Sequence, residues 1–86
     1  MEQINKKIRK ILVLGIKGMA GHVIFKSLPK LGNYNVYGLA RNIEPTDKIF
    51  NLDVSNTKGL NEILDLKFDV FVLNTYSQEI YILAIL

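Results

Sequence analysis

The sequence of 86 residues contains no cysteine and a single histidine, His22. Neither a disulfide framework nor a thiolate metal cluster can therefore hold the chain together, and one imidazole is too little for a histidine metal site. Hydrophobic residues make up 49% of the chain and charged residues 22%, with a net charge of only +3. A disordered, solvating chain is excluded because it needs low hydrophobicity and high net charge. The length suffices for one domain at most.

Long apolar runs are also missing. Residues 11–14 are shorter than the roughly 7–15 apolar residues of a secretory signal. Polar residues interrupt segment 68–86, whereas a membrane span needs about 20 predominantly apolar residues. The first ten positions hold four basic residues without interleaved aromatics, which we interpret as a solvated lead-in to a strand rather than a nucleic-acid or membrane patch. We expect a cytoplasmic protein that binds neither nucleic acid nor membrane.

Strand and helix patterns alternate along the chain. Residues 11–14 form a branched apolar run of the kind found in strands buried on both faces, and Gly15 stops it. Helical spacing follows, which we expect to end near Leu28 before a stop at Gly32. The predicted inner face of this helix comprises Ala20, Val23, Ile24, Ser27, Leu28 and Leu31, with His22 facing out.

The second half of the chain repeats this alternation. A second strand is predicted at 36–40 and a short third one at 49–54, joined by a polar loop over 41–48 that is too short for a crossover helix. Ser55, Asn56 or Thr57 can cap the next helix, and a last buried strand covers 70–73. The inner face of that helix comprises Leu60, Ile63 and Leu64. The order predicts an α/β fold, a partial Rossmann-type parallel sheet of about four strands with right-handed crossovers and helices packed on it.

A glycine motif lies between the first strand and the first helix. Gly15, Gly18 and Gly21 are spaced G-x-x-G-x-x-G. The first glycine allows a tight turn, the second lets the backbone approach a pyrophosphate at the helix N-terminus, and the third lets the helix pack closely on the sheet. An ordinary glycine-rich turn is the alternative. The strand–turn–helix context favours dinucleotide binding.

These motifs resemble the extended short-chain dehydrogenase/reductase superfamily, and more narrowly its sugar-nucleotide reductases of the dTDP-4-dehydrorhamnose reductase type. The resemblance covers residues 10–41, the Asp53-Val54 pair and residues 69–74. Its narrower part depends mainly on Met19, the Gly21-His22 pair and the missing second crossover helix. Leu14 departs from the pattern, since the superfamily often has threonine there.

Arg41 at the end of the second predicted strand suggests which nucleotide is bound. An acidic residue near this position would bind the ribose 2′-hydroxyl of NAD, whereas a basic one accommodates the 2′-phosphate of NADP. Lys17 in the glycine loop lies close enough to assist. We predict a preference for NADP(H), with NAD(H) as a second option. Arg41 as a solvated strand-end charge is the alternative.

The resemblance implies further cofactor contacts. It places Asp53 and Val54 beside the adenine ring, although Asp53 can equally begin the turn into the next helix. Asn74 ends the last predicted strand and either lines the cofactor crevice or merely terminates the strand. Met19 either touches the cofactor or packs in the core, and we favour the core.

The catalytic pair of this superfamily is missing. Its reductases carry a Tyr-x-x-x-Lys pair, in which the lysine lowers the pKa of the tyrosine so that the phenol can protonate the substrate. The chain has four tyrosines, and none of them has a lysine four positions later. They are Tyr34, Tyr37, Tyr76 and Tyr81. We therefore expect the chain as given to be catalytically silent.

These observations leave three interpretations open. The first takes residues 1–86 as the N-terminal part of an NAD(P)-binding Rossmann domain, incomplete at its C-terminus, from a parent that reduces a 4-keto group on a nucleotide-linked deoxysugar. That parent is an NAD(P)-dependent oxidoreductase, or an epimerase or dehydratase of the same superfamily, and only the full-length parent binds the nucleotide-sugar. The others are a stand-alone NAD(P)-sensing module and a remnant that binds nothing. The apolar residues 80–86 suggest an element buried against later strands, or a surface for self-association.

Overall fold

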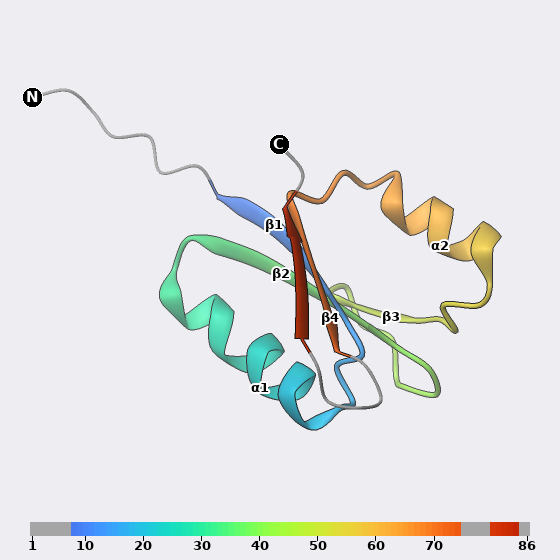
Figure 1. Cartoon of the computed structure of the whole chain (residues 1–86), viewed down its shortest axis with the longest axis horizontal. Helices are drawn as coiled ribbons and strands as arrows, with labels where there is room; N and C mark the ends of the chain where they lie inside the picture. The colour runs from blue at the N-terminus through green and yellow to red at the C-terminus, as the bar shows by residue number, and fades with distance from the viewer. Residues whose placement is uncertain (1–7, 75–79, 85–86) are drawn as a thin grey trace, which may run out of the picture.

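The computed structural model describes residues 8–74 and 80–84, which form one sheet flanked by helices (Figure 1). Within these described residues, two α-helices, α1 and α2, and a short 3₁₀ helix, η1, accompany five strands. In chain order the elements are β1 (Arg9–Leu14), α1 (Met19–Ser27), η1 (Leu28–Leu31), β2 (Tyr34–Ala40), β3 (Ile49–Asn51), α2 (Thr57–Leu64), β4 (Val70–Asn74) and β5 (Ile80–Ala84).

Four of the strands are parallel. β1 pairs with β2 and with β4, and β2 pairs with β3, so the parallel part has the order β3-β2-β1-β4. This matches the first four strands of the doubly wound dinucleotide-binding folds, whose order is 3-2-1-4-5-6. The predicted α/β fold with a four-stranded parallel sheet is confirmed.

The two helices cover opposite faces of the sheet (Figure 1). Successive side chains of a strand point to opposite faces, and β1 shows this clearly. Ile11 and Val13 face a core cluster that includes Ile24 of α1, whereas Leu12 faces a second cluster that includes Leu60 of α2. Because β1 is buried on both faces, its sequence is a continuous apolar run rather than an alternating one.

Helix α1 packs through a face that overlaps only partly with the predicted one, since Ile24 and Leu28 lie inside as predicted. The residues turned toward the sheet are Gly21, Ile24, Phe25 and Leu28, which follow the i, i+3, i+4, i+7 spacing. Val23 and Leu31, predicted to lie inside, are 56% and 65% exposed. For these two residues the prediction was wrong, and the buried face instead includes Gly21, which packs tightly against Gly15 of the glycine loop.

The connections are those that the sequence predicts. Residues 41–48 form a loop without a helix, and the polypeptide returns to pair β3 in parallel with β2. The third strand is shorter than predicted and ends at Asn51. Asn56 is the N-cap of α2, where its side chain accepts a hydrogen bond from Gly59 N at 3.0 Å. Gly32, with φ of 90°, terminates η1.

Strand β5 departs from the parallel pattern. It pairs antiparallel with β4 and occupies one edge of the sheet. Part of the apolar segment that we expected to be buried against later strands therefore extends this sheet, and Ile82 is 71% exposed. In residues 8–74 and 80–84, no helix is long and apolar enough to cross a membrane.

Candidate functional site

A cavity of about 490 Å³ opens at the carboxyl ends of the parallel strands. Small-molecule sites in proteins typically have volumes of about 300–1,000 Å³, and open α/β sheets bind ligands at this edge where the strand order reverses. Here the reversal lies at β1, between β2 and β4. The lining residues are Leu14, Gly15, Lys17, Gly18, Leu39, Ala40, Arg41, Asn42, Leu52, Asp53, Val54, Leu73 and Asn74.

The glycine loop leaves β1 by a turn that requires its first glycine. Gly15 has φ of 90°, a left-handed conformation that side chains with a Cβ rarely adopt. Its amide donates to the carbonyl of Leu39 at 2.8 Å, which ties the loop to β2. A Cβ at Gly21 would overlap the carbonyl oxygen of Gly15, so the third glycine permits the close contact between α1 and the loop.

Asn74 fills the space that the second glycine leaves. Its side-chain Nδ2 donates to the carbonyl oxygen of Gly15 at 3.4 Å, and a Cβ at Gly18 would overlap that same Nδ2. Gly18 therefore has a packing reason in addition to the phosphate approach that its spacing predicts. The amide joins the end of β4 to the glycine loop, and no partner is found for its buried Oδ1 among the residues described.

The N-terminus of α1 faces this edge without a negative charge of its own. Gly18 is the N-cap and has an extended backbone, with φ of −71° and ψ of 160°. No side chain caps the helix, and its first turn holds no acidic residue. The first amides of a helix lack intrahelical acceptors and lie at the positive end of its dipole. The arrangement suits an anionic group.

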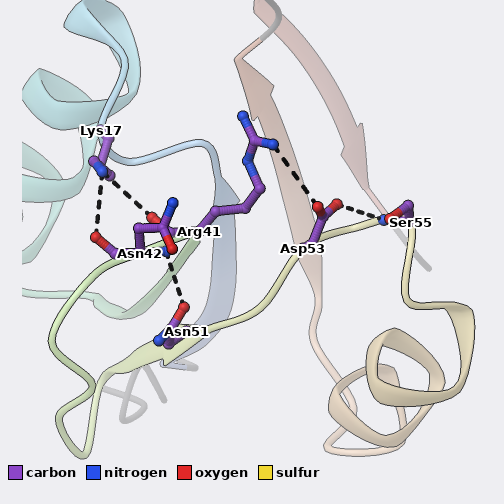
Figure 2. Close-up of polar contacts among 6 residues, drawn as sticks. All are labelled: Lys17, Arg41, Asn42, Asn51, Asp53 and Ser55. Atoms are coloured by element: carbon purple, nitrogen blue, oxygen red, sulfur yellow. Dashed lines mark hydrogen bonds and ion pairs between the residues drawn. The ribbon is translucent and has the colours of Figure 1, made fainter.

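Polar side chains from two neighbouring strand ends meet beside the cavity (Figure 2). Arg41 directly follows β2 and Asp53 follows β3, and their side chains form an ion pair with 3.8 Å between Nη1 and Oδ2. Ser55 N donates to Asp53 Oδ1 at 3.0 Å. On the other side of Arg41, the amide of Asn42 donates to Asn51 Oδ1 at 3.0 Å.

Lys17 reaches across from the glycine loop to the end of β2 (Figure 2). Its ammonium donates to the carbonyl oxygens of Arg41 at 3.4 Å and Asn42 at 3.2 Å. Lys17 thus adds positive charge next to Arg41. It also ties the backbone around Arg41 to the glycine loop.

The carboxyl group of Asp53 is held in its charged form. The backbone hydrogen bond from Ser55 lowers the pKa of Asp53 below its usual value, with smaller contributions from the Ser55 side chain and from the charge of Arg41. A negative charge therefore stands next to the Arg41 guanidinium at neutral pH.

The cavity brings together most of the residues that the sequence singles out. Gly15, Lys17, Gly18, Arg41, Asp53, Val54 and Asn74 all line it, whereas Met19 and Gly21 do not. Met19 is 79% exposed, so its expected place in the core is wrong. His22 is exposed on α1, as predicted. In the described part of the chain, no three acidic or histidine side chains gather as metal ligands.

Several lining residues were not predicted. Asn42 lies two positions beyond the end of β2 and Leu52 one position beyond the end of β3. Leu14 and Leu73 lie within the last two positions of β1 and β4. The signal that could have found them is position alone, since residues at the carboxyl ends of parallel strands share one edge of the sheet. The three leucines among them, Leu14, Leu52 and Leu73, give the cavity apolar walls.

No protein-family model matches this chain, and comparisons with curated proteins and with solved structures find no match either. The structure by itself shows a small α/β domain with a four-stranded parallel sheet. Function is therefore argued from the residues around the cavity.

Proposed function

We propose that this chain binds NADP(H) in the cavity at the carboxyl ends of β1–β4, as the nucleotide-binding part of a sugar-nucleotide reductase. The observation that carries the proposal is the convergence of the glycine loop, the uncapped start of α1 and the Arg41 side chain on one cavity. A dinucleotide needs a place for its pyrophosphate and one for its adenosine end. The cavity has an uncapped helix start and an apolar wall that support this proposal.

The parts of the nucleotide have natural positions in this cavity. The pyrophosphate would lie on the amides at the start of α1, and the apolar wall that includes Leu52 and Val54 would take the adenine ring. The 2′-phosphate would meet Arg41, whose side chain is 57% exposed. Bound nucleotide would supply hydride, while this chain's residues bind and orient it.

The assignment to a reductase of nucleotide-linked 4-keto deoxysugars comes from the motifs of residues 10–41, 53–54 and 69–74. A stand-alone NAD(P)-sensing module is the second candidate, favoured by the absence of a Tyr-x-x-x-Lys pair in the sequence. Both candidates require nucleotide binding. We expect no turnover of a nucleotide-linked 4-keto sugar by this chain alone, which an NADPH oxidation assay would check.

Isothermal titration calorimetry with NADPH and NADH tests the proposal. We expect NADPH to bind more tightly, and Arg41→Ala to weaken NADPH binding about tenfold, since a hydrogen bond to a charged group contributes about 1.5–3 kcal/mol and 1.4 kcal/mol is a factor of ten. Arg9→Ala is the matched control, because Arg9 is exposed at the amino end of β1, away from the cavity. Tighter binding of NADH that Arg41→Ala leaves unchanged would refute the NADP(H) preference.

A further inference from the structure

The carboxylate of Asp53 lies beside Arg41, where we expected only the basic side chains of Arg41 and Lys17 from the sequence. β2 ends without an acidic residue, but β3 runs parallel beside it, with Ala40 paired to Asn51. Leu52 N donates to the carbonyl of Ala40 at 3.0 Å, which keeps the two polypeptide segments together beyond the last strand pair. Asp53 is thereby carried to within 3.8 Å of the Arg41 guanidinium (Figure 2).

A backbone hydrogen bond orients the Asp53 carboxylate, whereas the guanidinium that it faces lies at the end of a long side chain. Asp53 has a short side chain whose Oδ1 accepts a hydrogen bond from the backbone of Ser55. The backbone of Arg41 is tied by Lys17, yet its long side chain carries the charge outward and is 57% exposed. An exposed ion pair of this kind contributes only about 0–1 kcal/mol, so an anionic ligand can displace it.

NADP(H) and NAD(H) would interact differently with the ion pair of Arg41 and Asp53. A 2′-phosphate bound to Arg41 would displace the Asp53 carboxylate from the guanidinium and then lie near a like charge. A 2′-hydroxyl carries a proton that a carboxylate accepts, which is how an acidic residue recognises NAD at this edge of such folds. The same side chain therefore opposes one ligand and favours the other.

We propose that Asp53 is a specificity-determining residue of this site, which lowers the preference for NADP(H) by competing for Arg41 and by accepting a hydrogen bond from the 2′-hydroxyl of NAD(H). The proposal rests on the proposed function. In it Asp53 acts on the 2′ position of the ribose, whereas the sequence motif places it beside the adenine ring. The two roles predict different binding data.

Asp53→Asn separates them, because it removes the charge and keeps the shape of the side chain. We expect the ratio of the NADH to the NADPH dissociation constant, measured by isothermal titration calorimetry, to rise about tenfold, mainly through tighter NADPH binding. Asp65→Asn is the matched control, since Asp65 is exposed at the end of α2 and does not line the cavity. For Asp65→Asn, the ratio of the two dissociation constants should equal that of the wild type.

The outcomes discriminate between the two proposals. An unchanged ratio in Asp53→Asn, or equal weakening of both nucleotides as an adenine contact predicts, would overturn the role of Asp53 while nucleotide binding stands. Failure of the wild-type chain to bind either nucleotide would overturn the proposed function, and the role of Asp53 with it. Thermal unfolding of each variant in buffer shows that the compared proteins are folded.

Discussion

Replacing Gly21 by alanine adds a methyl group at the tightest contact between α1 and the glycine loop. A Cβ at this position would overlap the carbonyl oxygen of Gly15, and it would lie 3.1 Å from the carbonyl carbon of Gly15 and 3.2 Å from Nδ2 of Asn74. The nearest obstacle is backbone, which cannot rotate away as a side chain can. Relief requires α1 to move off the sheet.

Two opposing contributions set the size of the effect. Alanine is more favourable than glycine inside a helix by about 1 kcal/mol. Overpacking in a closely packed interior costs about 1–3 kcal/mol and occasionally more. Because the overlap is with a backbone atom, we take the upper part of that range and expect Gly21→Ala to lower the free energy of unfolding by about 1–2 kcal/mol. For a domain of this size that is a fall in Tm on the order of 4–16 °C.

Gly59→Ala makes the same chemical change in the other helix. A Cβ at Gly59 would meet Cδ1 of Leu52 at 2.7 Å and Nδ2 of Asn56 at 3.1 Å. Leu52 Cδ1 lies at the end of a side chain that can shift at little cost, and the Asn56 side chain has to give only slightly while it keeps its hydrogen bond to Gly59 N. We expect the gain in helix propensity to offset the contact, and the stability to stay within ~0.5 kcal/mol of the wild type.

Urea unfolding followed by circular dichroism measures both variants under one condition. The midpoint should fall for Gly21→Ala and stay nearly constant for Gly59→Ala, with the same slope in both, since the slope reports the surface exposed on unfolding. A Gly21→Ala protein as stable as Gly59→Ala would refute the reasoning. It would mean that α1 can move away from Gly15 without loss of packing.

Three further predictions concern other contacts. Asp69→Ala should lower the free energy of unfolding by about 1.5–3 kcal/mol in urea titrations, because Asp69 Oδ2 accepts a 2.7 Å hydrogen bond from Lys10 N where β1 meets the start of β4. Folding lowers the pKa of Asp53, so its contribution to stability is present above the unfolded pKa of about 3.9 and is lost as the pH falls through the folded pKa. The wild type should therefore have a higher free energy of unfolding than Asp53→Asn in urea titrations at neutral pH. This difference should vanish when the titrations are repeated at acidic pH. Ile82→Lys should reduce self-association in sedimentation velocity, because Ile82 is exposed on the edge strand β5; equal association of both proteins would contradict this.

Much of the fold could be predicted because its signals are local. The apolar run of β1, the glycines after it and the capping side chain of Asn56 each depend on a few neighbouring residues. The loop over 41–48 follows from its length alone. The face of α1 could not be predicted, because Val23 and Phe25 are both apolar, and the Gly21–Gly15 contact decides which of them turns inward.

In the candidate site, too, some features depend on neighbouring residues and others on contacts between distant segments. The glycine spacing and the basic Arg41 at a strand end are local features, and the binding of a nucleotide phosphate that they predict stays a prediction. The pairing of Asp53 with Arg41 could not be predicted, since the two are twelve positions apart and meet only because β2 and β3 run parallel and end together. The fit of the Asn74 amide against Gly18 depends likewise on β1 and β4 being neighbours.

The sequence by itself determined an α/β chain, without cysteine and with one histidine, whose glycine turn leads from a strand into a helix. Those properties follow from composition, spacing and backbone preferences, which act over a few residues. Tertiary structure alone decided that β5 returns antiparallel, which face of α1 is buried, and that a carboxylate stands beside the cation at the cavity. Each depends on contacts between segments distant in sequence, and close packing selects among local options that the sequence leaves equal.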